Sequence, residues 1–92
     1  MGRVAGTARP LGPQRAYSFV LCNTRPGTGF AVLRKVKEVP GVKSAYACWG
    51  RPDIFAFCEA KGLRELTSLV FDGIQRTDGI EASETHIVAE DV

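Results

Sequence analysis

The chain has 92 residues, which is enough for one small domain with a limited core. Its composition is ordinary for a globular protein, with 45% hydrophobic and 24% charged residues and a formal net charge of +2. No apolar run approaches the roughly 20 residues of a membrane helix, so we expect no membrane association.

Two features favour a cytoplasmic location. The N-terminus carries arginines but no apolar segment of the kind found in secretory signals. The cysteines, Cys22, Cys48 and Cys58, are odd in number, lack a CxxC spacing and lie in apolar stretches. We therefore predict three buried, reduced thiols.

The positive charge is concentrated at the N-terminus. Arg3, Arg9 and Arg15 precede all ten acidic residues, so the remainder of the chain is near neutral. That remainder lacks the basic footprint of a nucleic-acid-binding protein. Residues 1–15 are rich in Gly, Pro and Arg, and the preferred prediction for them is a flexible N-terminal tail. An arm that orders on a partner and an over-long start are the alternatives, and residues 16–92 predict the folded domain.

The first half of the domain predicts a strand and a helix. Residues 16–23, AYSFVLCN, are apolar on both faces and end at the turn signals of TRPGTG. Thr28 can cap the helix that follows, and the PGV segment ends it. The apolar stripe expected on this helix contains Phe30, Leu33, Val36 and Val39, with Ala31 and Val32 beside them.

The second half predicts a hairpin, a helix and a last strand. VKSAYACW (42–49) and DIFAFCEA (53–60) read as strands around the turn WGRPD. LRELTSLVFDGIQR (63–76) reads as a helix, and an Asp-Gly turn leads into the final strand. The stripe expected on this second helix contains Leu63, Leu66, Val70 and Ile74.

A weak internal repeat suggests the topology. PGVKSAYAC follows the first helix and DGIEASETH follows the second, 38 residues later. Two units that return in the same way predict a ferredoxin-like βαββαβ fold, a four-stranded antiparallel sheet with both helices on one face. Right-handed crossovers then determine the topology.

Strand alternation predicts a bare aromatic sheet face. Pairing around a turn centred at Gly50-Arg51 or Arg51-Pro52 places a mostly small set towards the helices. That set is Ala45, Ala47, Trp49, Ile54, Ala56 and Cys58. The opposite face carries Tyr46, Cys48, Phe55 and Phe57.

Something must cover Tyr46, Phe55 and Phe57, because soluble monomers rarely expose such a patch. A homodimer formed through this face is the preferred prediction, since symmetric dimers are the commonest assembly. Single-stranded RNA, stacked on the aromatic rings, and a small ligand are the alternatives. The near-neutral charge and the missing Arg/Lys-Gly-aromatic pattern in the third strand count against RNA.

The sequence contains no recognisable catalytic, metal or cofactor motif. Its one histidine, His86, lies on the last strand, where we expect a surface residue. The alternative is a base or haem ligand in a small dimeric ferredoxin-like enzyme of the oxygenase or isomerase type. We predict no enzymatic activity, no cofactor and no metal.

Two polar groups could bind a ligand. Gly50 and Asp53 flank a turn stiffened by Pro52, and a carboxylate there could hold an ammonium or simply cap the turn. Ser83 and Thr85 begin the last strand, and their hydroxyls could hold a carboxylate or simply lie on an edge.

These motifs together resemble the effector-binding domain of the Lrp/AsnC family of feast/famine regulators, also called the regulation-of-amino-acid-metabolism domain. The match covers Ala16 to about Glu90. Its features are PGV before a strand, the apolar-Gly-X-X-Asp hairpin at Trp49 to Asp53, and DGI followed by SET.

The resemblance implies a ferredoxin-like fold whose sheets pair face to face in a dimer. It implies assembly of dimers into octameric or decameric rings, with an amino-acid effector between dimers. Carried over residue by residue, the ligand-binding candidates are Gly50, Asp53, Ser83 and Thr85.

Two departures from the family pattern shape the functional prediction. Pro52 stands where the family usually has an aromatic residue. Fifteen non-helical residues stand where full-length members carry a helix-turn-helix, as in the stand-alone members. We therefore predict a regulatory domain that binds an amino-acid effector and oligomerises but does not itself bind DNA. It would sense an amino acid, co-assemble with a full-length regulator, or form a purely structural ring.

Overall fold

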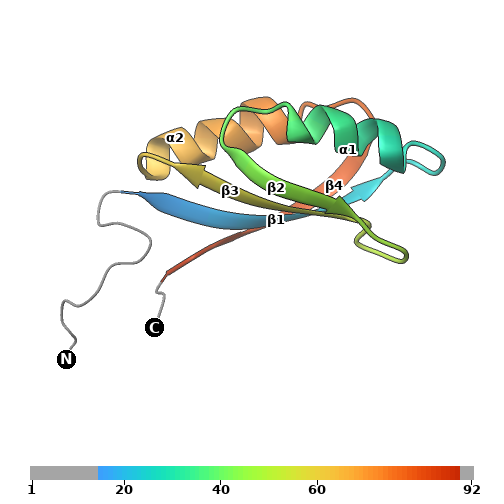
Figure 1. Ribbon diagram of the computed structural model, residues 1–92, viewed down its shortest axis with the longest axis horizontal. Helices are drawn as coiled ribbons and strands as arrows, with labels where there is room; N and C mark the ends of the chain where they lie inside the picture. The colour runs from blue at the N-terminus through green and yellow to red at the C-terminus, as the bar shows by residue number, and fades with distance from the viewer. Residues whose placement is uncertain (1–14, 90–92) are drawn as a thin grey trace.

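Two helices cover one face of a four-stranded antiparallel sheet in the computed structural model, which describes residues 15–89 (Figure 1). The strand order is β2-β3-β1-β4. The elements are β1 (Ala16–Thr24), α1 (Gly29–Lys37), β2 (Val42–Ala47), β3 (Ile54–Ala60), α2 (Leu63–Ser68), the π-helical η1 (Leu69–Ile74) and β4 (Ile80–Ile87). The predicted ferredoxin-like fold is confirmed. The tail predicted at residues 1–15 lies, apart from Arg15, outside the described residues.

The core lies between the sheet and the two helices. Small residues on the strands let the helices pack closely, and Ala45, Ala56 and Ala60 are all buried. The larger core residues are Val20, Val32, Val36, Ile54, Leu66, Val70 and Ile74. Burying apolar surface contributes roughly 25 cal/mol per Å², so the packing of this layer favours the folded state.

The stripe predicted on α1 was wrong at Phe30 and at Ala31, which are both exposed. Val32 and Val36 are buried, whereas the Phe30 side chain is 71% exposed. At 3.6 residues per turn, Phe30 lies on nearly the opposite side of the helix from Val32. Thr28 precedes the helix as predicted but does not cap it with its side chain, because its hydroxyl donates to the Arg25 carbonyl at 2.6 Å.

The second predicted helix begins as an α-helix and continues as a π-helix. Leu66, Val70 and Ile74 are buried at spacings of four residues. Leu63 was predicted to belong to the same buried stripe, but it is 57% exposed, so that prediction was wrong. The wider π turn, with the Gln75 N–H donating to the Val70 carbonyl at 2.8 Å, keeps residues four apart closer to one line.

The repeat noticed in the sequence has a structural basis. Gly41 and Gly79 both have positive φ angles, of 98° and 102°. Gly41 accepts the Glu59 N–H at 2.8 Å, and Gly79 accepts the Arg25 N–H at 2.7 Å. A Cβ on Gly41 would overlap the Leu69 side chain of η1, and one on Gly79 would lie 2.6 Å from Val32 Cγ2 of α1. Each glycine therefore packs against the helix of the other repeat.

The β2–β3 hairpin has the predicted pairing parity. Tyr46 pairs with Phe55 and Ala45 pairs with Ala56, a register centred on Gly50-Arg51. The connection is longer than the predicted two-residue turn, because residues 48–53 lie between the strands.

The end of β2 was predicted to face the helices, but it is exposed. Ala47 is exposed and Trp49 is 98% exposed, because the hairpin projects beyond the end of the sheet (Figure 1). Cys48 is also exposed, so only Cys22 and Cys58 are the buried thiols that the sequence predicts.

Candidate functional site

An apolar surface occupies the sheet face opposite the helices, and we call it the open face. Phe19 and Tyr46 are 50% and 64% exposed there, although neither is a loop residue. Phe57 packs against Phe19 with ring centroids 5.0 Å apart. A hollow of about 560 Å³ is lined by Phe19, Leu21, Ser44, Tyr46, Phe55, Ala56 and Phe57.

Sequence reasoning placed Tyr46, Phe55 and Phe57 on this face, and the structure agrees. It missed Phe19 and Leu21, which extend the apolar surface onto the central strand β1. The alternation of Phe19 and Leu21 with Ser18 and Val20 in β1 was the signal that could have identified them.

The open face is polar at its β4 edge. Glu84 pairs with Leu21 and His86 pairs with Phe19 across the β1–β4 ladder, which places both on this face. His86 Nε2 lies 2.9 Å from Glu84 Oε2, and both side chains are more than half exposed. Within residues 15–89 no group of three or more His, Cys, Asp or Glu residues could hold a metal ion.

A second concave region lies between the hairpin and the beginning of α1, and we call it the hairpin cavity. Its volume is about 370 Å³. Its lining residues are Gly27, Gly29, Phe30, Ala47, Cys48, Trp49, Gly50 and Asp53. The Asp53 carboxylate is the one charged group among them. The structure therefore brings the candidates Gly50 and Asp53 into one cavity.

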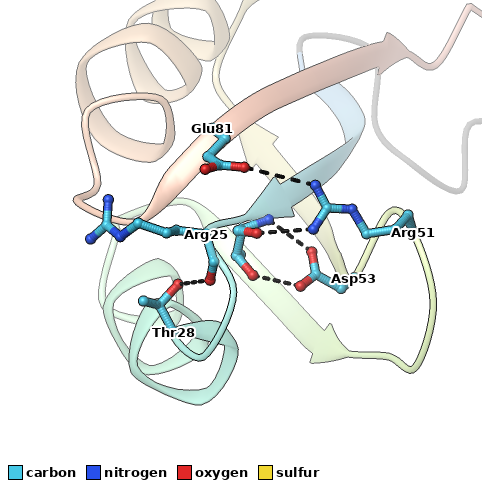
Figure 2. Close-up of polar contacts among 6 residues, drawn as sticks. Arg25, Thr28, Arg51, Asp53 and Glu81 are labelled. Carbon is cyan, nitrogen blue, oxygen red and sulfur yellow. Dashed lines mark hydrogen bonds and ion pairs between the residues drawn. The ribbon is translucent and has the colours of Figure 1, made fainter.

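Asp53 joins the hairpin to the end of β1. Its Oδ1 accepts the Thr24 N–H at 3.0 Å, and its Oδ2 accepts the Thr24 hydroxyl (Figure 2). Its own N–H donates to the Cys22 carbonyl at 3.0 Å. The side-chain bonds therefore run to a neighbouring strand, and they differ from the turn cap that the sequence left open as the alternative. A carboxylate has about four acceptor positions, so two remain for another donor.

Arg51 completes this network from the other side of the hairpin. Its Nη1 donates to the Thr24 carbonyl at 3.0 Å, and its Nη2 lies 3.9 Å from Glu81 Oε1 on β4 (Figure 2). Thr24 is 2% exposed and binds both charged side chains of the hairpin. Sequence reasoning assigned no role to Arg51 or Thr24, because Arg51 occupies a variable position of the hairpin motif and only the tertiary fold brings the two residues together.

Ser83 and Thr85 lie elsewhere in the same chain. Both lie on β4, where they pair with Cys22 and Val20 of β1. β4 is the edge strand on the other side of β1 from the hairpin strands. Ser83 Oγ accepts a hydrogen bond from Gln75 Nε2 at 2.9 Å. Neither hydroxyl lines the hairpin cavity.

The two buried thiols, Cys22 and Cys58, belong to the hydrophobic core. Burial, followed by the negative charge of Asp53, raises the pKa of the Cys22 thiol to about 11. Burial also raises the pKa of the Cys58 thiol. Both thiols therefore stay protonated at neutral pH, since burial disfavours the thiolate.

Comparisons with known proteins identify the family. The model of the Lrp/AsnC ligand binding domain matches residues 18–92. No curated protein sequence matches the chain. No helix among residues 15–89 is long and apolar enough to cross a membrane.

Three solved structures are similar in fold. The TTHA0845 protein of Thermus thermophilus is 28% identical, with a TM-score of 0.78, and the match covers 84% of this chain and 96% of that one. E. coli AsnC is 23% identical, with a TM-score of 0.78 and coverage of 99% and 61%. A transcriptional regulator from Neisseria meningitidis in complex with L-Met is 19% identical, with a TM-score of 0.71 and coverage of 100% and 62%. The chain therefore spans about three fifths of the length of the last two proteins, and their likeness shows the shared fold.

The sequence resemblance is thus confirmed over nearly the whole described part of the chain. A ferredoxin-like sheet with one open face, a cavity at the Gly-X-X-Asp hairpin and a family match over residues 18–92 agree with one another. The chain belongs to the Lrp/AsnC ligand binding domain family.

Proposed function

We propose that this domain binds an amino-acid effector, oligomerises, and modulates transcriptional regulation of amino-acid metabolism without itself binding DNA. The observation that carries the proposal is the hairpin cavity, which contains a single carboxylate in a domain of a ligand-binding family. The proposed function has no catalytic step.

The chemistry of a free amino acid fits this cavity. Its ammonium needs an acceptor, and Asp53 has acceptor positions left after binding Thr24. Gly50 has a φ angle of 99° and no atom within 4 Å of the position of a Cβ, so a ligand can approach the backbone there.

The ligand carboxylate needs donors, for which Ser83 and Thr85 remain the candidates. Because neither lines the hairpin cavity of its own chain, they would join the site only when a second copy presents its β4 to the hairpin. The proposed site therefore lies between copies, as expected for an effector that couples binding to assembly.

The open face supports assembly of the chain. Tyr46, Phe55 and Phe57, together with Phe19 and Leu21, would be covered by the same face of a second copy. Burial of these side chains supplies a non-directional driving force of roughly 25 cal/mol per Å². Dimers formed in this way would assemble into an octameric or decameric ring, or with a full-length Lrp/AsnC regulator.

Independent DNA binding does not fit the described part of the chain. Residues 15–89 have two helical regions, and both pack against the sheet. The ten acidic residues all lie beyond residue 15 and balance the basic residues there. A gel shift with the purified protein at about 150 mM salt should show no sequence-specific complex.

Two measurements test the proposal. Native mass spectrometry at micromolar concentration should show dimers and larger even-numbered assemblies. A thermal-shift screen of the twenty amino acids at millimolar concentration should raise the Tm with one or a few of them, since a ligand that binds only the folded state stabilises it. A monomer that no amino acid stabilises would contradict the proposal.

A further inference from the structure

We propose that the ligand of the hairpin cavity carries an apolar or aromatic side chain that packs between Phe30 and Trp49. This inference rests on the proposed function, because it names the class of amino acid that the same site selects.

The first observation is the exposure of two aromatic side chains at one cavity. Trp49 is 98% exposed and Phe30 is 71% exposed, the largest values among the exposed large hydrophobic residues of the described chain. They come from different elements, the hairpin that follows β2 and the first turn of α1, and both line the hairpin cavity. Neither ring contributes to the hydrophobic core or to the hollow of the open face.

The second observation is the charge of the cavity wall. The residues beside the two aromatic rings are mostly small and uncharged, namely Gly27, Gly29, Ala47, Cys48 and Gly50. Asp53 alone carries a charge, and no basic side chain lines the cavity. An acidic ligand side chain would meet like charge and no counter-ion.

A basic ligand side chain would also lack a partner of opposite charge in this cavity. One carboxylate can compensate the ammonium that every amino acid carries, so a second positive charge would lie without an anionic partner. The attraction between an exposed cation and an aromatic ring is weak, so it would offset little of the free-energy cost of partly desolvating that charge. An apolar side chain, in contrast, would remove two exposed aromatic surfaces and its own surface from water.

The third observation is the available space. The cavity volume of about 370 Å³ lies within the range of small-molecule sites. Glycines at positions 27, 29 and 50 leave it unobstructed by side chains. A branched aliphatic or aromatic side chain can therefore enter between the rings, whereas glycine as a ligand would leave the space unfilled.

Trp49 provides a direct readout, because it is the only tryptophan in the chain. Its emission should shift to shorter wavelength when a ligand side chain covers the indole. We would titrate the wild-type protein with L-leucine, L-phenylalanine, glycine, L-glutamate and L-lysine, and follow tryptophan emission and binding heat in parallel. We expect L-leucine or L-phenylalanine to bind at least about tenfold more tightly than the other three.

Two variants locate the contact. Phe30→Ala should weaken binding of the apolar ligand about tenfold or more and leave the fold of the domain unchanged, because the side chain lies outside the core. Trp49→Ala should likewise weaken binding of the apolar ligand, and calorimetry measures this affinity because the variant lacks the fluorescent indole. The matched control is Phe71→Ala, which removes an aromatic ring that is 55% exposed on η1 and does not line the cavity, and it should bind like wild type.

The outcomes separate this inference from the function on which it rests. If no amino acid changes emission, heat or Tm, the proposed function fails and the inference fails with it. If L-glutamate or L-lysine binds as tightly as the apolar ligands, or if Phe30→Ala and Trp49→Ala both bind like wild type, the inference is overturned while effector binding stands.

Discussion

The open face and the hairpin cavity are held in different ways. Side chains of the open face contact one another mainly through rings, as Phe19 and Phe57 do. The hairpin cavity is held by directional polar contacts, with Asp53 and Arg51 both bound to Thr24. A surface with non-directional contacts requires a large complementary partner, whereas an oriented carboxylate suits a small polar ligand. The difference is consistent with the proposed function, in which the first region serves assembly and the second serves recognition.

The largest effect should come from a charge on the open face. Phe57→Asp would place a carboxylate in the proposed interface, where burial without a partner is strongly unfavourable. We expect a monomer or an aggregate in native mass spectrometry in place of the wild-type assembly. Phe71→Asp, on η1, is the matched control and should assemble normally. Intact assemblies of the Phe57→Asp variant would remove the open face from the interface.

Glycine substitutions compare the core with the hairpin. Gly79→Ala should lower the free energy of unfolding by roughly 2–4 kcal/mol, because a positive φ and a Cβ placed 2.6 Å from Val32 Cγ2 are both unfavourable. Gly50→Ala has a similar φ but open space around it, so we expect a loss of about 1 kcal/mol. Urea unfolding of the two variants measures the difference, and equal losses would show that the hairpin is coupled to the core.

Removing the charge of Asp53 tests recognition. Asp53→Asn should reduce affinity for the effector about ten- to a hundredfold, or roughly 1.5–3 kcal/mol, because an amide pairs poorly with an ammonium. The control is Thr24→Val, which removes one hydroxyl bond to Asp53 but keeps its charge. It should cost about 1 kcal/mol of stability and change affinity less than Asp53→Asn does. Calorimetry that found equal losses in both variants would make Asp53 a structural residue only.

The smallest effect is expected from thiol labelling. Cys48 lines the hairpin cavity and is exposed, whereas Cys22 and Cys58 are buried. A pH of 8 is well below the pKa of about 11 of the Cys22 thiol, so this thiol is protonated. Iodoacetamide should therefore label Cys48 alone in the folded protein.

A bound effector should slow the labelling of Cys48 several-fold, as read by intact mass, because the ligand would shield the cavity. Cys48→Ser should abolish labelling of the folded protein. Rapid labelling of all three thiols in the folded protein would show that the sheet opens.

Local sequence patterns determined the elements and the sheet faces. Alternation in residues 42–47 and 54–60 placed Tyr46 and Phe55 on the same face, because the strand period of two is a property of the backbone itself. The repeated X-Gly-(Val/Ile) pattern predicted two equivalent turns, and Gly41 and Gly79 do share a positive φ and equivalent hydrogen bonds. Gly50 and Asp53 entered one cavity because they are three residues apart in a single turn.

Only the tertiary structure determines which distant segments of the chain contact one another. The Asp53 carboxylate binds Thr24, which lies 29 residues away, and no local pattern encodes that pairing. Phe30 and Trp49 were predicted to face the core, but they line the hairpin cavity because the helix turns Phe30 outward and the hairpin extends past the sheet. Ser83 and Thr85 lie across β1 from the hairpin strands, because the strand order places β4 at the opposite edge from β2. Their predicted role in binding the same ligand as Asp53 therefore stays a prediction that requires two copies of the chain. Sequence periodicity specifies which face a side chain occupies, whereas strand order and the extent of the hairpin specify what it meets there.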